Sequence, residues 1–303
     1  MTDKMLKGII DMHVHTDPDL RPRVYDDLSL ADKALSIGAR AIVIKSHLGS
    51  TAARAWICNR YLERAHGFSS DRPAPFTMYG GIVLNRQTGG LDPWAVEACL
   101  KLGGKVVWLP TQSSRNHLRM MHQDEGASVD VIRDGRPVPE LLNIFRLIKD
   151  HDAVMATAHI SPEEAFIVTE AARAHGIRKI VITHPEWWLV GMSLDDQLRL
   201  VKDYDVILEH CFAQPMGGGI YKSNLPMNLE AIQACGYKNV MISTDSGQLE
   251  NPPWEEGLSQ YIAYLREHGI PDEELYHMTH TIQEDLLGLP PLPSSEIHDI
   301  LSV

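Results

Sequence analysis

A strand-then-helix unit recurs along the chain, and this repeat is the feature that most constrains the fold. Apolar runs of strand length alternate with segments of helical periodicity from residue 8 to about residue 268. The runs expected to form strands are residues 8–16, 39–44, 76–84, 105–111, 153–159, 179–184, 206–211 and 239–244. Eight such units predict a (β/α)₈ TIM barrel. An open doubly wound sheet can also reach eight strands, but no Gly-x-Gly-x-x-Gly sequence follows the first one.

Three segments depart from the repeat. The polar stretch at about 113–138 has no clear period, and we expect it to be an insertion after the fourth strand. The run Gly217-Gly-Gly219 lacks the lysine of a phosphate-binding loop and is interpreted as a mobile hinge. Residues 271–303 are expected to form a short C-terminal helical tail that could serve an interface. We expect one domain, residues 1–303, with the barrel at about 8–268.

Charge and cysteine content restrict the partners and the location. The formal net charge of −12 argues against nucleic acid and anionic membranes as partners. No segment has the length of a membrane span, and the N-terminus lacks a signal-peptide core. The four cysteines are scattered, which suits the reducing cytoplasm. We therefore expect a cytoplasmic protein acting on a small molecule, with the formation of a homo-oligomer left open.

Residues able to bind metals cluster at the predicted strand ends. A barrel of this kind carries its active site where the carboxyl ends of the strands meet. Six of the eight predicted strands end in such residues, namely His13 and His15, Lys45 and His47, His159, His184, Glu209 and His210, and Asp245. His13 and His15 share a face of their strand, but a bare His-x-His pair has little specificity in a chain with 15 histidines. Imidazoles with one carboxylate suit Zn²⁺, or Fe, Mn or Co.

These motifs resemble those of the amidohydrolase superfamily of metal-dependent hydrolases. The resemblance rests on Asp11-Met-His13-Val-His15, on His159 and His184, and on Ser243-Thr-Asp245-Ser246. It implies that His13, His15 and Asp245 bind one metal ion, and that His159 and His184 bind a second ion or flank the substrate. It also implies that Asp245 is the general base toward metal-bound water.

The chain departs from the superfamily pattern at the end of the fourth predicted strand. Binuclear members usually carry a bridging lysine carbamate or glutamate there, whereas this chain has Leu109-Pro-Thr-Gln112. Lys45 or His47 could replace the missing ligand, although Lys45 could instead pair with Asp245 or Glu209, and His47 could cap the next helix. Glu209 and His210 have opposite faces, so at most one can enter the site. The sequence leaves open whether the site binds one or two metal ions, and it slightly favours two.

The ligand set predicts hydrolysis by a metal-activated water. The metal lowers the pKa of water and polarises a carbonyl, and Asp245 transfers the proton, which would cleave an amide, lactam, ester or lactone. Arg115 in the insertion could bind an acidic group of the substrate, or belong to a solvated loop. Trp187 and Trp188 could wall an apolar pocket, or pack in the core.

Three other functions stay open. A phosphoesterase of the polymerase-and-histidinol-phosphatase kind also has His-x-His and a histidine after the second strand, but it closes with Asp-x-His where this chain has Gly247. A metal-dependent decarboxylase and a non-catalytic binding protein on the same scaffold are the others. His277 and His280 have helical spacing and are expected to pack in the tail.

Overall fold

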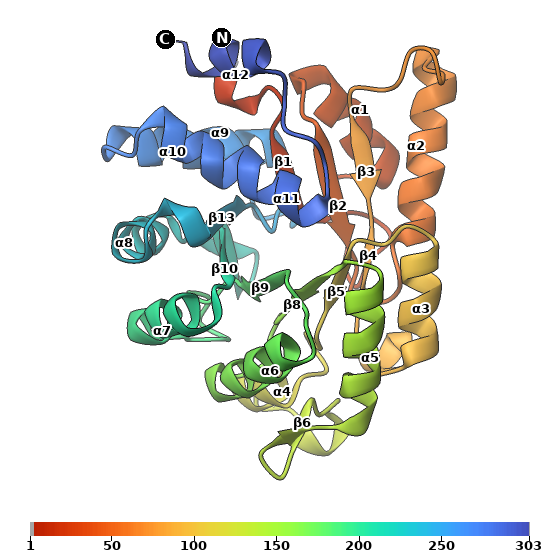
Figure 1. The fold of residues 1–303 in the computed structure, drawn as a ribbon, viewed down its shortest axis with the longest axis vertical. Helices are drawn as coiled ribbons and strands as arrows, with labels where there is room; N and C mark the ends of the chain where they lie inside the picture. The colour runs from red at the N-terminus through yellow and green to blue at the C-terminus, as the bar shows by residue number, and fades with distance from the viewer. Residues whose placement is uncertain (1–2, 303) are drawn as a thin grey trace.

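The computed structural model describes residues 3–302, which form an α/β fold with parallel strands at the centre and helices around them (Figure 1). The central strands are β1 (Ile10–His15), β2 (Ala41–Lys45), β3 (Thr77–Tyr79), β4 (Gly81–Val83), β5 (Val106–Trp108), β8 (Val154–Ala156), β9 (Ile180–Thr183), β10 (Ile207–Cys211) and β13 (Val240–Ser243). The helices that follow them are α1 (Asp27–Ile37), α2 (Ala52–His66), α3 (Pro93–Lys101), α5 (Pro139–Asp150), α6 (Pro162–Ala174), α7 (Leu194–Tyr204), α8 (Leu225–Cys235) and α9 (Trp254–Glu267). Short 3-10 helices are η1 (Lys4–Leu6), η2 (Arg86–Thr88) and η4 (Tyr237–Asn239).

Local sequence explains where the helices begin. Asp26 and Ser161 each accept a hydrogen bond from a backbone N–H of the first turn and form capping boxes at α1 and α6. Asp92 caps α3 in the same way, and proline follows it at the first helical position. These caps end the loops that follow β1, β4 and β8.

The central strands belong to two parallel sheets that meet at Gly80. One sheet has the order β1-β2-β3 and the other β13-β10-β9-β8-β5-β4. The sequence predicted one strand at 76–84, whereas the structure interrupts it between β3 and β4. The N–H of Thr51 donates to the carbonyl of Gly81, and a Cβ on Gly80 would lie 2.5 Å from the Thr51 carbonyl. The start of α2 therefore takes the hydrogen bonds that would continue the β2 ladder.

The two sheets also approach each other between β1 and the end of β13. Val14 and Ser246 form an isolated parallel bridge, and the His15 N–H donates to the Ser246 carbonyl at 2.8 Å. Gly247 follows with φ of 118°, and a Cβ there would lie 2.0 Å from the His15 carbonyl oxygen. Glycine at 247 thus allows the last strand to run against the His13–His15 segment.

We expect Gly247→Ala to destabilise the protein and to displace His15. The new methyl group would collide with backbone rather than with a flexible side chain, and the φ angle is unfavourable as well. The expected loss is about 2 kcal/mol or more of the free energy of unfolding, measured by chemical denaturation. Gly236→Ala is the matched control, because Gly236 also has positive φ but a methyl group added there would meet no described atom within 4 Å. Equal losses for the two variants would contradict the close approach.

The buried hydrophobic side chains form two clusters, one on the inner face of the strands and one on the outer face. The larger one lies between strands and surrounding helices, while the smaller one gathers inward-facing side chains such as Ile10, Met12 and Trp108. Ile282, Leu286 and Leu287 from the C-terminal tail belong to the inner cluster. The tail therefore packs on the strands instead of standing free. Its elements are α10 (Asp272–Tyr276), the π-helix η5 (His277–Thr281), α11 (Ile282–Leu287) and α12 (Ser294–Leu301).

Tail packing also accounts for His280, as expected from the sequence. Its side chain is buried, stacks on Tyr276, and lies 3.1 Å from the Lys7 carbonyl through Nε2. His277 packs edge-on against Tyr237. Neither histidine lies at the carboxyl ends of the strands.

The remaining segments contain more structure than the sequence suggested. Residues 113–138 include α4 (Arg115–Met120), η3 (Glu125–Ala127) and the short strands β6 (Ile132–Arg133) and β7 (Arg136–Pro137). The predicted hinge Gly217–Gly219 is instead the turn of an antiparallel hairpin made by β11 (Ala213–Gly217) and β12 (Ile220–Ser223). Glycines at positive φ fit this turn because hairpins require such angles. No helix among residues 3–302 is long and apolar enough to cross a membrane.

Candidate metal centre

Five histidines from four strand ends form a ring of imidazoles at one end of the strands. Neighbouring ring centroids are 5.5 Å apart for His13 and His15, 4.8 Å for His15 and His47, and 6.4 Å for His47 and His159. His184 closes the ring, at 5.1 Å from His159 and 5.9 Å from His13. All five side chains are buried. The structure thus brings together every histidine that the sequence placed in the site.

Three ligand atoms converge within this ring. Nε2 of His13 and Nε2 of His15 each lie 3.1 Å from Oδ1 of Asp245. This oxygen is buried and has no hydrogen-bond partner among residues 3–302, so the three atoms face one another without the geometry of hydrogen bonds. An unsatisfied buried carboxylate oxygen is costly unless it binds a cation. Two imidazole nitrogens and one carboxylate oxygen fit a divalent transition metal ion.

The other ring nitrogen of each histidine faces a second carboxylate. Nδ1 of His13 lies 3.2 Å from Oε2 of Glu209, and Nδ1 of His15 lies 3.1 Å from Oδ2 of Asp19. A carboxylate on one nitrogen fixes the proton there and leaves the opposite nitrogen free for a metal. Glu209 and Asp19 therefore orient the two imidazoles toward Asp245.

Local irregularities of the backbone aim these side chains. The pairing of β1 with β2 shifts register between Asp11 and Val14, which lets both Met12 and His13 face inward. Asp11 holds this bulge, since its carboxylate accepts hydrogen bonds from the His13 N–H, the Thr244 hydroxyl and the Trp254 indole. His184 and Asp245 both have positive φ at the ends of their strands. Such backbone strain in residues other than glycine is concentrated at functional sites.

The charges of the site favour a cation at the converging atoms. Burial would lower the pKa of His13, but the charges of Asp245 and Glu209 outweigh it and raise the pKa to about 9. Burial would raise the pKa of Asp245, yet His13 and His15 hold it well below its usual range. Burial lowers the pKa of the remaining imidazoles of the ring, those of His15, His47, His159 and His184. An ionised Asp245 and a neutral His15 are the protonation states that a metal needs, and a bound metal ion would displace the extra proton of His13.

Lys45 points into the same centre. Its Nζ is buried, lies 2.9 Å from Nε2 of His13, and has a pKa lowered by burial. His47 holds its Nδ1 at 2.9 Å from the Thr111 hydroxyl, at the end of the fourth predicted strand. The sequence offered no bridging ligand at the end of that strand. The strand end instead supplies a hydroxyl group that positions His47.

The side chains of Glu209 and His210 point to opposite faces of β10, as the alternation of side chains along a strand requires. Glu209 enters the centre, whereas His210 turns away and lies 2.9 Å from Glu186 through Nδ1. Glu209 was considered as a bridging ligand, but its contact is with the far nitrogen of His13. Cys211, which sequence reasoning did not select, is also inward, with Sγ 3.9 Å from the same nitrogen.

A cavity of about 440 Å³ opens over the ring. It is lined by His15, Lys45, His47, His159 and Asp245, by the apolar side chains of Leu20, Met121, Trp187, Trp188, Leu189, Pro215 and Met216, and by Arg21, Arg23, Gln112, His117, Gly217 and Gln248. Trp187 packs edge-on against His159 and His184 at 4.7 and 4.6 Å, and Trp188 is partly exposed. The two tryptophans therefore wall the cavity, which is the first of the two roles considered for them.

Arg115 lies outside this cavity. Its guanidinium is 45% exposed and lies 2.7 Å from the Asp130 carboxylate, within the segment 113–138. The prediction that Arg115 binds an acidic group of the substrate is not supported, because a local carboxylate already occupies it.

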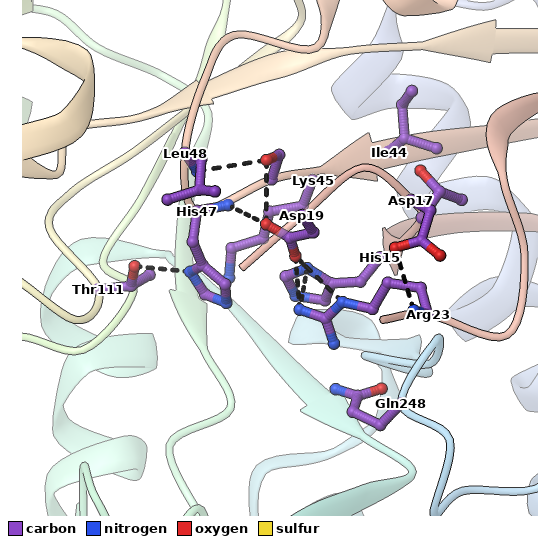
Figure 2. A network of polar contacts seen from close by, with 12 residues as sticks. His15, Asp17, Asp19, Arg23, Ile44, Lys45, His47, Leu48, Thr111 and Gln248 are labelled. Carbon is purple, nitrogen blue, oxygen red and sulfur yellow. Dashed lines mark hydrogen bonds and ion pairs between the residues drawn. The ribbon is translucent and has the colours of Figure 1, made fainter. Parts of the chain in front are cut away.

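Sequence reasoning missed Asp19, Arg23, His117 and Gln248. Asp19 and Arg23 lie in the polar loop after β1, where they hold each other and His15 (Figure 2). His117 comes from α4 and faces His159 with 2.8 Å between the two Nδ1 atoms. Loops at the carboxyl ends of strands carry function, so the position of these residues was the available signal.

We expect Glu209→Gln to weaken metal binding by about 10- to 100-fold, the usual cost of losing an orienting carboxylate. The amide removes the charge that fixes the proton on Nδ1 of His13. The measurement is a competition titration with a chelating dye. Asp130→Asn is the matched control, since it removes a carboxylate at the surface. An unchanged metal affinity in Glu209→Gln would show that Glu209 does not orient His13.

Solved structures with a similar fold include amidohydrolases and a decarboxylase. An amidohydrolase from Pseudomonas aeruginosa superposes with a TM-score of 0.61 at 12% identity, covering 98% of each chain. An amidohydrolase from Burkholderia multivorans with bound zinc has a TM-score of 0.57 at 13% identity, covering 93% of this chain and 99% of the other. The 2,6-dihydroxybenzoate decarboxylase from Rhizobium has a TM-score of 0.52 at 12% identity, with coverage of 93% and 99%. These similarities confirm the predicted amidohydrolase resemblance at the level of the fold.

The sequence family is narrower than the fold. Residues 8–209 match the model of a family of unknown function, DUF6282, and the chain belongs to this family. No curated protein sequence matches the chain.

Proposed function

We propose that the protein is a metal-dependent hydrolase that cleaves an amide, lactam, ester or lactone bond of a small molecule. The observation that carries this proposal is the convergence of His13 Nε2, His15 Nε2 and Asp245 Oδ1, with Asp245 Oδ1 left without a hydrogen bond in the described part of the chain. The likeness to amidohydrolase structures, one of them with bound zinc, supports it. The cytoplasm is the location that we propose for this activity, and either a monomer or a homo-oligomer is compatible with it.

The strands would act as the closed barrel of that fold. Two features support this: the run β3-Gly80-β4 contributes to both sheets, and the Val14–Ser246 bridge joins β1 to the end of β13. A barrel gathers the strand ends around one mouth, as the ring of imidazoles requires.

His13, His15 and Asp245 would hold the metal ion, with Zn²⁺ suited to this donor set. The ion would supply Lewis acidity, lowering the pKa of water and polarising the scissile carbonyl. We propose a single ion, although the sequence slightly favoured two. Both oxygens of Asp19 already accept hydrogen bonds from Arg23, Ser46 or the His47 N–H, so Asp19 has no free site for a second ion.

Asp245 would be the proton carrier of the reaction. Its carboxylate lines the cavity and is ionised, so it can accept a proton from the attacking water. The same proton then passes to the leaving nitrogen or oxygen as the bond to carbon breaks. His159 lines the cavity and is neutral, so it can donate or accept a hydrogen bond at the substrate. His184 is neutral too, and Trp187 packs edge-on against both rings.

Lys45 would stabilise negative charge near the scissile bond or serve as an additional ligand. Its Nζ lies beside His13, and it lines the cavity. Burial lowers the pKa of this ammonium group from its ordinary value.

Decarboxylation is the second candidate. It is supported by the likeness to the Rhizobium decarboxylase, and it would suit the single ion proposed above. The phosphoesterase alternative loses support because Gly247 stands where its closing motif would need another residue, and the close approach to His15 excludes a side chain there.

A substrate panel with zinc-loaded protein tests the proposal. It contains aryl esters, lactones and amides, an aryl phosphate, and aromatic carboxylates assayed for CO₂. We expect turnover within the first group that stops on chelation. Turnover of the aryl phosphate alone, or CO₂ release alone, would contradict hydrolysis of a carboxylic-acid derivative.

A further inference from the structure

Arg23 lines the cavity, and its buried guanidinium makes fewer hydrogen bonds than its nitrogen atoms allow. Its side chain is 2% exposed and lies on the loop after β1. Nε and Nη2 both donate to Asp19, and Nη2 lies 3.3 Å from Nδ1 of His15. Nη1 is buried and has no hydrogen-bond partner within residues 3–302. Buried donors on charged groups are expensive to leave unpaired, so this nitrogen calls for an acceptor that the described chain does not provide.

The cavity is where such an acceptor can come from. Arg23 lines it, and Gln248 lies next to Arg23, to which it is bridged through the backbone (Figure 2). Arg21, the other arginine of the lining, is 40% exposed and already pairs with Glu250 at 2.7 Å. Lys45 is in contact with His13. Of these three cations, Arg23 is the one with a buried side-chain nitrogen that has no hydrogen-bond partner in the described part of the chain.

The position of Arg23 places its guanidinium beside the reacting groups. Its guanidinium lies at the Nδ1 edge of His15, while Asp245 Oδ1 lies at the Nε2 edge of the same ring. Part of the wall is apolar and aromatic, with Leu20, Met121, Trp187, Trp188 and Met216. A ligand that satisfies both features has an apolar, ring-sized body and an anionic group close to the bond that reacts.

Resting on the proposed hydrolase function, we infer that the substrate is a small, ring-bearing carboxylate whose carboxylate group is bound by Nη1 of Arg23. A single free guanidinium nitrogen suits the planar carboxylate, because one or two N–H donors satisfy one of its oxygens.

The test measures binding rather than turnover, so it stands apart from the reaction. Ligand-observed NMR titrations of zinc-loaded full-length protein use benzoate, the neutral analogue benzamide, and phenyl phosphate. The variants are Arg23→Gln and Arg21→Gln, the latter being the matched control at the other lining arginine. We expect benzoate affinity to fall at least about ten-fold in Arg23→Gln and less than about two-fold in Arg21→Gln, with benzamide unaffected in both.

Arg23→Lys protects the test against loss of the fold. Lysine keeps a cation beside Asp19 but has no nitrogen in place of Nη1. The variant should therefore still weaken the binding of benzoate and leave the binding of benzamide unchanged. Wild-type benzoate affinity in a folded Arg23 variant would overturn the inference, as would equal binding of benzoate and benzamide by the natural protein. Benzoate binding that is lost on chelation but kept in Arg23→Gln would show that the metal binds the carboxylate, which overturns the inference. Phenyl phosphate binding more tightly than benzoate, in a way that depends on Arg23, would show that the group bound by Arg23 is a phosphate, which overturns it as well.

The result separates the subsite from the reaction. If benzoate selectivity depends on Arg23 while no ester, lactone or amide is hydrolysed, the carboxylate subsite stands and the proposed hydrolysis falls. If hydrolysis is found but Arg23→Gln leaves benzoate selectivity unchanged, the reaction stands and the subsite falls.

Discussion

Asp245→Asn is expected to lower turnover by about 10²- to 10⁴-fold, the range that a positioned general base contributes. The amide keeps an oxygen close to Nε2 of His13 and His15, so metal should remain bound, but it cannot accept the proton of the attacking water. The measurement is the rate at saturating substrate, taken together with the metal content of the same sample.

Asp130→Asn is the control for this substitution, because it makes the same chemical change at a carboxylate paired with Arg115 away from the cavity. A turnover in Asp245→Asn within about three-fold of the natural protein, with metal still bound, would remove Asp245 from the proton transfer.

Removal of the metal is expected to abolish hydrolysis altogether. Without the cation, the Lewis acidity that lowers the pKa of the attacking water and polarises the scissile carbonyl is lost. Dialysis against a chelator should leave no measurable turnover, and added Zn²⁺ should restore it.

A mock-dialysed sample controls for inactivation during the procedure, and circular dichroism checks that the chelated protein remains folded. Full activity in folded protein shown to be free of metal would disprove the proposed mechanism.

The strand ends of the site could be predicted because periodicity fixes where strands stop. The carboxyl ends of parallel strands meet, so His13, His47, His159 and His184 were placed together before any side-chain contact was known. The same reasoning placed Glu209 and His210 on opposite faces, and the structure shows this separation.

The orientation of individual ring nitrogens could not be read from the sequence. Glu209 was a candidate bridging ligand, whereas it lies on Nδ1 of His13. The bulge that turns His13 inward beside Met12 breaks the strict alternation that strand patterns assume. The bulge is held by tertiary contacts of Asp11, whose partners Thr244 and Trp254 are distant in the chain.

Loop residues were predicted least well. Arg115 was selected because it is basic and near a predicted strand end, but Asp130 and Glu125 occupy it locally. Arg23 was not selected, although its loop brings it to His15 through Asp19. Loops have no period from which a side chain can be placed, so spacing alone did not distinguish these two arginines.

The claim that His13, His15 and Asp245 bind a metal ion is tested most directly by elemental analysis of the purified protein and of a His13→Ala/His15→Ala variant. We expect about one equivalent of a divalent transition metal per chain in the natural protein, from a three-ligand site of this kind. The double variant, checked for folding by circular dichroism, should have lost it. Equal metal content in the two proteins, or none in the natural protein after supply of Zn²⁺, would contradict the proposed metal centre.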